Sequence, residues 1–425
     1  MSEPGLDVVW RACAPRVLGA LVRRYGHFDA AEDAVQEALL AAARQWPVDG
    51  TPDDPKAWLI RVGSRRLVDR LRADEARARR EERVVRRRPI EELEPARPGA
   101  ESSDRDDTLA VMLLCCHPAL TRPSQVALTL RAVAGLTTAQ IAHAFLVPEP
   151  TMAQRIGRAK ARLEQEVGPF GVPAKADMPA RVAAVAQVLY LVFTEGHTAT
   201  TGGSLTSPPV SAEAIRLARE LHRVLPDDGE VSGLLALMLL TEARRRARTA
   251  ADGSFVPLAE QDRTRWDRGL IAEGTALVEA ALPMGPVGPY QLQAAIAAVH
   301  DEAPGASDTD WAQIELLYEM LVTRAPGPVV TLNRAVAVAQ VRGPQAALLL
   351  IEPLLGDGRM RRNHRLHSVH AHLLELDGQA AEARSAYVLA ARLATSIPEQ
   401  RHLQAAAERL ALQIAQDGET TVQGR

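Results

Sequence analysis

The sequence predicts an all-α protein, and three observations carry that prediction. Alanine, leucine and arginine, which lose little freedom on entering a helix, dominate the 425 residues, and aromatic residues make up only 4%. Runs of β-branched and aromatic residues at period two, the pattern typical of strands, are scarce. Apolar residues at helical spacing recur instead between turns rich in glycine and proline. We therefore expect helices throughout the chain.

Changes in composition divide the chain into four parts. Several prolines within a run of acids predict a linker over residues 85–105. A second break, rich in glycine and proline, follows residue 167. We expect helical domains over residues 6–84, 106–167 and 177–415, which agrees with the two to four domains that a chain of this length suggests.

Charge, cysteine content and hydropathy limit where the protein works. The net charge is −3, so the overall balance gives no sign of nucleic-acid binding. Three cysteines without the spacing of a disulfide framework predict a reducing compartment. The N-terminus has no apolar leader, and no stretch offers the roughly eighteen uncharged apolar residues that a membrane span needs. We expect a soluble, cytoplasmic protein with no membrane partner.

The first domain combines an acidic helix with a strongly basic one. Residues 28–46 form an amphipathic pattern, and a second helix is expected after Asp54, a suitable N-cap. Residues 61–88 hold twelve arginines against five acids. Such a run can be a solvated helix face. Its imbalance and the nearby Trp46 and Trp58 favour contacts with phosphates and unpaired bases instead.

The next domain has the pattern of a helix-turn-helix. Helical spacing runs over residues 124–131, 139–145 and 149–163, with breaks at Gly135 and Pro148. Polar residues on the last helix suit a major groove, because arginine fits guanine edges, glutamine fits adenine, and threonine fits phosphate or the thymine methyl group. Two further basic residues are placed to follow the DNA backbone. The candidates are Thr151, Gln154, Arg155 and Arg158 for bases, and Lys160 and Arg162 for the backbone.

Two motifs of the first domain resemble region 2 of the extracytoplasmic-function sigma factors, which direct bacterial RNA polymerase to promoters. They are Asp-Ala-Ala-Glu-Asp-Ala-Val-Gln-Glu at residues 29–37, and Pro-Lys-Ala-Trp-Leu-Ile at residues 55–60 with Asp-Arg-Leu-Arg at residues 69–72. The resemblance implies that the first helix binds the coiled coil of the polymerase β′ subunit and that the second reads the melted minus-ten element. The matching positions are Glu32, Asp33, Gln36 and Glu37 for polymerase, and Trp58, Arg61, Arg65, Arg66, Asp69, Arg70 and Arg72 for DNA. Arg65 departs from the family, which commonly has asparagine there, so the preferred minus-ten bases stay open.

The helix-turn-helix segment is similar to sigma region 4, which binds the minus-thirty-five element. Its motif has Leu-Thr, then Ile-Ala, a Val-Pro turn, and Arg-Ala-Lys-Ala-Arg-Leu at residues 158–163. Both modules therefore occur in the family's order, joined by a linker. The resemblance implies that RNA polymerase core, through its β′ and β subunits, and promoter DNA are the partners. It also implies that the linker enters the polymerase channel near the active site.

The C-terminal half contains a weak internal repeat. Gly343 and Gly378 lie about one tetratricopeptide period (~34 residues) apart, each between two helical patterns. Generic α-hairpins explain the same pattern equally well. We expect a tetratricopeptide-like domain of helical hairpins, each of which buries its apolar face against the next.

The start of this extension resembles a subgroup of the same sigma factors. Its opening, Val-Leu-Tyr-Leu-Val-Phe-Thr-Glu-Gly, stands at residues 188–196. The resemblance implies that the extension regulates the sigma modules in place of a separate membrane-bound inhibitor, with a protein or ligand as its own partner. Residues 194–203 are expected to form a polar loop, in which Glu195 and His197 are candidates for such contacts.

No motif in the sequence predicts catalysis. Walker-type loops, dinucleotide-binding glycine motifs and nucleophile elbows are absent, so we expect a protein that is not an enzyme and uses no cofactor. No metal site is expected either, because the histidines at His364, His367 and His370 spread around a helix without an accompanying carboxylate motif. The resemblance to regions 2 and 4 therefore implies a sigma factor. Two alternatives stay open: a helix-turn-helix regulator that acts without polymerase, and a tetratricopeptide-type scaffold whose N-terminal modules are incidental.

Overall fold

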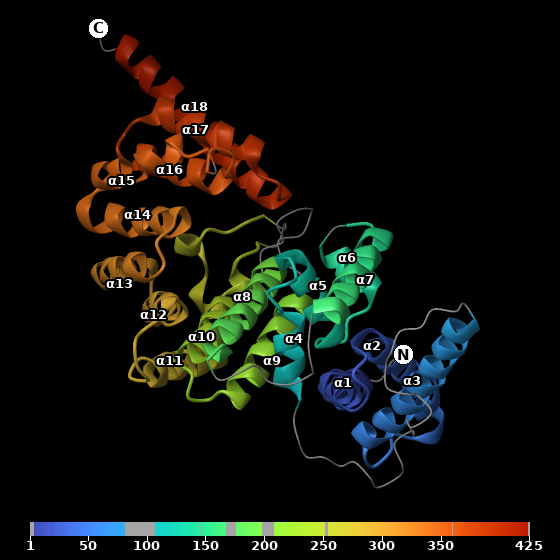
Figure 1. Cartoon of the computed structure of the whole chain (residues 1–425). Coiled ribbons are helices and arrows are strands. Elements are labelled where there is room, and N and C mark those ends of the chain that lie inside the picture. Colours follow the sequence, from blue (N-terminus) through green and yellow to red (C-terminus); the bar gives the residue numbers. More distant parts are fainter. Residues whose placement is uncertain are drawn as a thin grey trace. The chain divides into compact units, whose positions relative to one another are not determined.

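In its computed structural model the protein is built from α-helices joined by turns and short 3-10 segments (Figure 1). The structure describes residues 4–80, 107–145, 147–166, 176–197, 208–250, 254–358 and 360–423. An isolated antiparallel bridge joins Thr249 to Phe255. The predicted all-α class is confirmed. Within the same described segments, no helix is both long and apolar enough to cross a membrane.

Three helices pack together at the N-terminus. They are α1 (Pro4–Tyr25), α2 (Phe28–Asp49) and α3 (Pro55–Arg80). The backbone N–H of Ala57 donates to Asp54 Oδ1 over 2.9 Å, which confirms Asp54 as the predicted cap of α3. At Gly63, α3 lies so close to α1 that a Cβ atom would be 3.0 Å from Leu21 Cδ1. The absence of a side chain there therefore lets the basic helix pack tightly against the bundle.

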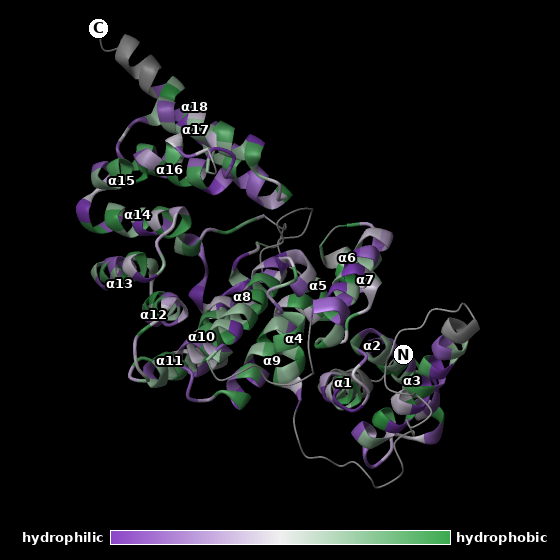
Figure 2. Cartoon of the chain, viewed as in Figure 1, coloured by the Kyte–Doolittle hydropathy of each residue, from purple (hydrophilic) through white to green (hydrophobic). Residues whose placement is uncertain are grey.

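Four shorter helices follow residue 106. They are α4 (Thr108–Cys115), α5 (Arg122–Ala132), α6 (Thr138–Ala144) and α7 (Glu149–Glu166). All eight residues of α4 are buried, and the helix is almost entirely green in Figure 2. Gly135 turns the chain with a φ of +71°, which glycine adopts without strain. Thr137 and Gln140 then cap α6 reciprocally, with distances of 2.8 and 3.1 Å. The predicted helix-turn-helix of α6 and α7 is present.

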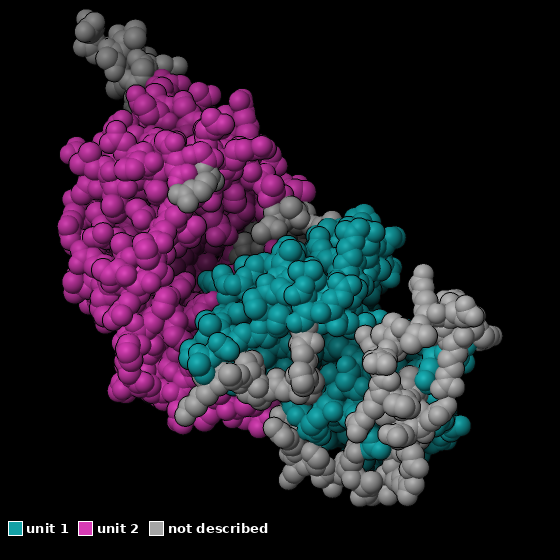
Figure 3. Space-filling model, in the orientation of Figure 1, with its two compact units in different colours: residues 1–192 teal, residues 193–425 magenta. Residues whose placement is uncertain are grey.

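The chain divides into two compact units, residues 1–192 and residues 193–425 (Figure 3). Helix α8 (Met178–His197) begins in the first unit and ends in the second. Its first half is tied to α4, because Arg181 Nη2 donates to the carbonyl oxygen of Leu113 over 2.7 Å. Residues 194–197, which were expected to open a polar loop, belong to α8 instead, and residues 198–203 lie outside the described residues.

The second unit is organised around α10 (Gly229–Ala243), of whose fifteen residues twelve are buried. It packs against α9 (Pro208–Val224), α11 (Arg268–Ala281) and α12 (Pro289–Glu302). Two glycines allow the close approach. A Cβ atom at Gly233 would lie 2.6 Å from the backbone nitrogen of Gln291, and one at Gly274 would lie 2.7 Å from Leu240 Cγ. Among the described residues, three 3-10 turns lie between α10 and α11: η2 (Arg245–Ala247), η3 (Leu258–Glu260) and η4 (Arg263–Arg265). A further turn, η5 (Ala306–Asp308), follows α12.

Six helices complete the second unit as successive hairpins. They are α13 (Trp311–Arg324), α14 (Pro328–Arg342), α15 (Pro344–Gly356), α16 (His364–Leu376), α17 (Ala380–Leu393) and α18 (Ile397–Gln423). Gly343 joins α14 to α15 with a φ of +88°, and Gly378 joins α16 to α17 with a φ of +79°. The two glycines of the predicted repeat thus turn two equivalent hairpins. The expected linker over residues 85–105 lies outside the described residues, and the expected domain limits stay predictions.

Candidate nucleic-acid interface

The four residues expected to bind polymerase lie on successive turns of α2. Glu32 and Asp33 lie one helical turn before Gln36 and Glu37, so the four residues share one side of the helix. Their exposure differs widely: Glu37 is exposed, Gln36 and Asp33 are half-buried, and only 1% of the Glu32 surface is accessible. In this structure, therefore, only part of the acidic side of α2 can meet another molecule.

Arginines of α3 pair with this acidic side. Arg70 Nη1 donates to Asp33 Oδ2, and Arg66 Nε lies 3.7 Å from Glu37 Oε2. Both Arg66 and Glu37 keep more than half of their side-chain surface exposed. Such exposed pairs contribute little stability, at most about 1 kcal/mol, so a partner can replace them at small cost.

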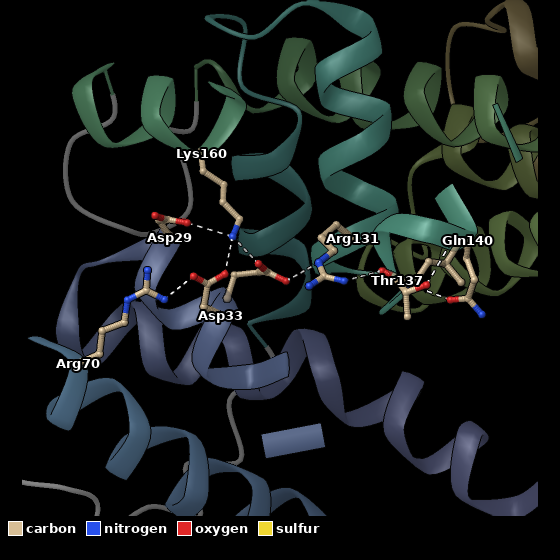
Figure 4. Close-up of polar contacts among 9 residues, drawn as sticks. Asp29, Asp33, Arg70, Arg131, Thr137, Gln140 and Lys160 are labelled. Carbon is tan, nitrogen blue, oxygen red and sulfur yellow. Dashed lines mark hydrogen bonds and ion pairs between the residues drawn. The ribbon is translucent and has the colours of Figure 1, made fainter. Parts of the chain in front are cut away.

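Two basic residues of the helix-turn-helix module also reach α2 (Figure 4). Lys160 of α7 places its Nζ 2.5 Å from Glu32 Oε2, 2.9 Å from Asp33 Oδ1 and 3.0 Å from Asp29 Oδ1. Arg131 of α5 places its Nε 2.9 Å from the second oxygen of Glu32. One carboxylate of α2 is thus held between two cations that both come from the other module.

Burial and charge act in opposite directions in this cluster. Burial alone lowers the pKa of Lys160, but the Glu32 carboxylate and the hydrogen bonds to Glu32 and Asp33 raise that pKa above its usual value. Burial likewise raises the pKa of Asp33, but hydrogen bonds from Lys160 and Arg70 hold it below its usual value. Both groups are therefore charged at neutral pH.

A cavity of about 530 Å³ opens between α2 and α3. Its walls are formed by Ala41, Gln45, Arg61, Val62, Arg65, Arg66 and Asp69. Four of these were predicted to meet the minus-ten element, and the structure brings them together around one space. Guanidinium groups bind phosphates in a bidentate manner and stack on base faces, so the cavity has the chemistry for an unpaired nucleotide. Arg70 and Arg72, also predicted, are exposed on the same helix but do not line the cavity.

The two tryptophans near this cavity pack against each other. The ring centroids of Trp46 and Trp58 lie 5.4 Å apart in an edge-to-face arrangement. Trp46 is 3% exposed and belongs to the core, whereas Trp58 is half-buried. Of the two rings, only Trp58 retains surface on which a base could stack.

Helix α7 presents most of its predicted DNA contacts on one exposed side. Thr151, Gln154, Arg158 and Arg162 are exposed, and Arg155 is half-buried beside them. Their spacing of three or four residues follows the helical repeat, as a groove-reading helix requires. Lys160 lies on a different side of α7 and is only 6% exposed, because it points to the acids of α2. In this arrangement it has no free surface for a phosphate.

Comparison with known proteins agrees with this organisation. Residues 9–77 match the family model described as Sigma-70 region 2, and residues 110–163 match the one described as Sigma-70, region 4. An uncharacterised protein of Rhizobium meliloti (strain 1021), R00370, is 42% identical over 423 residues, covering 98% of each chain. The probable ECF RNA polymerase sigma factor SigI of Mycobacterium tuberculosis is 28% identical over 160 residues, 38% of this chain and 54% of that protein. The chain belongs to the extracytoplasmic-function sigma factor family.

As a sigma factor, the protein carries a long extension beyond region 4. Residues 181–282 match a family of unknown function (DUF6596), and this match covers α8 to α11. No solved structure matches the chain. The match with R00370 runs through the extension as well as through residues 9–77 and 110–163, so the chain is similar to this relative over nearly its whole length.

Three residues of this sigma factor's sites escaped the sequence reasoning. Gln45 lines the α2–α3 cavity, and Asp29 and Arg131 take part in the cluster around Glu32. Gln45 could have been found, because it lies on the same side of α2 as Ala41, one turn away. Arg131 gives no such signal, because it is one basic residue at the end of α5, and its partner Glu32 lies 99 positions earlier in the sequence.

The candidate residues of the sigma factor's extension have structural partners. His197 Nδ1 lies 3.3 Å from Glu242 Oε2, and its ring stacks on Phe193. His367 Nε2 lies 2.9 Å from the carbonyl oxygen of Arg361, and His364 lies 3.4 Å from Glu399. Over the described residues, no group of three or more histidine, cysteine or acidic side chains has the geometry of a metal site.

Proposed function

We propose that this sigma factor binds RNA polymerase core through α2, holds an unpaired minus-ten strand on α3, and docks α7 in the minus-thirty-five major groove. The observation that carries the proposal is the α2–α3 cavity, where three guanidinium groups and a carboxylate face a space next to the acidic side of α2. Duplex-reading regulators need no such feature. Catalysis belongs to polymerase, and the protein works in the cytoplasm, where polymerase is found.

Charge explains how the two surfaces divide the work. The acids of α2 suit a basic partner surface, while the arginines of α3 suit phosphates and base faces. In region 4, we assign the exposed Arg158 and Gln154 to base edges and the exposed Arg162 to the DNA backbone. Promoter binding should therefore weaken steeply as salt rises.

The extension is proposed to regulate these modules. The support is its direct continuation from the sigma modules, since α8 belongs partly to each unit. Arg181 on the first half of α8 bonds to α4 of region 4, so that half is part of the first unit's structure. A truncation that removes only the extension must therefore leave α8 in place and end after His197, not at the break near residue 170.

The test is in vitro transcription with purified bacterial core polymerase, full-length protein and fragmented genomic DNA, with transcript starts mapped. We expect new starts that share upstream elements at a fixed spacing. Arg61→Ala and Arg65→Ala should each reduce open-complex formation. Arg24→Ala is the matched control, because it removes the same charge from region 2 at a guanidinium that lies over Tyr25 and not at the cavity.

Three outcomes would each count against one part of the proposal. If core polymerase gains no new starts and binds neither the full-length chain nor the chain ending at His197, the first unit is not a working sigma factor. If duplex binding persists while Asp33→Ala and Glu37→Ala leave activity intact, the protein is a polymerase-independent regulator. Equal transcription by the full-length and truncated chains would contradict only the proposed regulation by the extension.

A further inference from the structure

The contact between regions 2 and 4 is built from the same residues that the proposed function assigns to outside partners. Glu32, a predicted polymerase contact, is 1% exposed because Lys160 and Arg131 cover it. Lys160, a predicted DNA-backbone contact, is 6% exposed because Glu32, Asp33 and Asp29 surround it. Each module thus occupies a functional surface of the other.

A second point of contact lies between α1 and α4. Gly19 of α1 packs so closely on α4 that a Cβ atom there would collide with the Cβ of Asp107 and lie 3.4 Å from Val111 Cγ2. Beside it, Arg23 Nη1 forms a 2.5 Å ion pair with Asp107 Oδ2. The two modules therefore meet through close helix packing as well as through charge, which distinguishes the contact from a chance pairing of long side chains.

We propose that region 4 masks the polymerase-binding side of region 2 in the free protein, and that core polymerase must displace Lys160 and Arg131 from the acids of α2. This inference rests on the proposed function, and it adds an internal competitor for the same acids. The described structure is the closed form. Opening it frees the α2 carboxylates for polymerase and Lys160 for DNA in one step.

Because the contact is held by charge, Lys160 and Arg131 can be exchanged reversibly for a basic surface of the polymerase. Buried carboxylates are costly without a counter-charge, so the α2 acids stay covered by Lys160 and Arg131 until another basic surface replaces them. A basic partner provides that replacement, and the free energy of opening is then offset by new ion pairs. The apparent affinity for core polymerase is lowered by the fraction of molecules that are open.

Two variants open the contact by different means. Lys160→Glu places a fourth carboxylate among the three of α2 and repels them. Gly19→Ala forces α1 and α4 apart, and it leaves region 2 itself sound because alanine is a better helix former than glycine. Arg162→Glu is the matched control for the shape of the free protein, because it makes the same charge change at an exposed position two residues along α7.

The experiment measures two quantities on the full-length chain. The first is the distance between spin labels at Ala73 of α3 and Ala153 of α7, both exposed, in a Cys13→Ser background because Cys115 and Cys116 are buried. The second is the affinity for core polymerase without DNA. We expect Lys160→Glu and Gly19→Ala to lengthen the label distance and to tighten core binding about tenfold, as for an open form populated at about 10%. Arg162→Glu should leave the label distance unchanged.

The outcomes separate this inference from the proposed function. If neither variant changes the label distance, the modules are not held together in solution and the inference fails. If the distance grows while core affinity stays the same, the contact exists but masks nothing, and the inference again fails. If both variants open and neither they nor the parent protein binds core polymerase, the assignment of α2 to polymerase is what fails.

Discussion

Each unit of the molecule contains a buried cluster of charges, and the two clusters are completed in different ways. In the second unit, Arg244 Nε lies 2.5 Å from Asp301 Oδ1. Arg244 directly follows α10 and Asp301 lies on α12, and these two helices pack against each other. In the first unit, Lys160 and Arg131 neutralise Glu32 from a different module. The chemistry of the pairs is the same. The difference is whether the oppositely charged partner comes from the same folded module or from another module, and we call a cluster of the second kind borrowed.

The cluster of the second unit is closed to solvent, because the side chains of Arg244 and Asp301 are only 12% and 0% exposed. Arg244 and Arg263 lie over the Trp266 ring at 5.3 and 4.6 Å, and both donate to carbonyl oxygens at the C-terminal end of α12. Positive groups are favoured at that end of a helix. The cluster of the first unit keeps partly exposed members, since Asp29 retains 40% of its side-chain surface. A closed cluster stabilises one fold, whereas an open, borrowed one can change partners.

The largest expected effect follows from breaking the closed cluster. Asp301→Ala removes a carboxylate that is 1% exposed and leaves Arg244 buried without its counter-charge. Loss of one partner of a buried pair costs about 3–5 kcal/mol. We expect a loss of that size in the free energy of unfolding of the second unit, measured by urea titration with hydrogen exchange of peptides from α10 to α12.

The contrast with the first unit provides the control. Lys160→Met should destabilise the contact between regions 2 and 4 while peptides within α1, α5 and α6 keep their own protection, because each module has its own core. If Lys160→Met instead unfolded the whole first unit, the cluster around Glu32 would be part of a structural core, as the cluster of Arg244 is. The two clusters would then not differ in the way proposed.

Local features of both units could be predicted from the sequence. The cap at Asp54, the turn at Gly135 and the pairing of Thr137 with Gln140 depend on residues a few positions apart, and each follows from backbone geometry. The hairpin turns at Gly343 and Gly378 belong to the same class. For the same reason the helices were predictable, while the C-terminal end of α8 was not.

The borrowed contacts could not be predicted. Helical periodicity places Ile156 and Leu163 in the core and leaves Lys160 outside it, but periodicity gives no information on what packs there. Asp29 and Lys160 are 131 positions apart, beyond any local pattern. Trp46 illustrates the opposite case: an aromatic residue beside a basic helix suggested base stacking, and the structure places it in the core against Trp58.

A pH change tests whether the closed cluster prevents protonation of His300, which lies beside its arginines. Burial, and then the positive charges of Arg244 and Arg263, lower the pKa of His300 to about 3. Its unfolded value is near 6.5. Between these values the unfolded chain binds a proton that the native chain does not, so the free energy of unfolding falls as the pH is lowered from 6.5.

At pH 5 this loss amounts to about 2 kcal/mol for a shift of this size. His300→Gln carries no titrating ring, so its urea midpoint should change less between pH 7 and pH 5 than that of the parent chain. Equal changes in the two proteins would mean that His300 is protonated in the native state. In that case the second cluster would be open to charge, like the first.

The smallest expected effect comes from an ion pair with good geometry and no burial. Arg219 of α9 binds Glu273 of α11 through two hydrogen bonds of 3.1 and 2.7 Å, yet the two side chains are 46% and 41% exposed. Water and salt screen such a pair, so a double-mutant cycle with alanine should give a coupling of at most about 1 kcal/mol, falling as salt is added. A coupling as large as the effect of Asp301→Ala would show that hydrogen-bond geometry, and not burial, sets the strength of the ion pairs. The number of hydrogen bonds in each cluster, and not its burial, would then explain why the closed and the borrowed cluster differ in strength. A small coupling would leave burial as the property that separates an ion pair that stabilises a fold from one that can be exchanged for a partner.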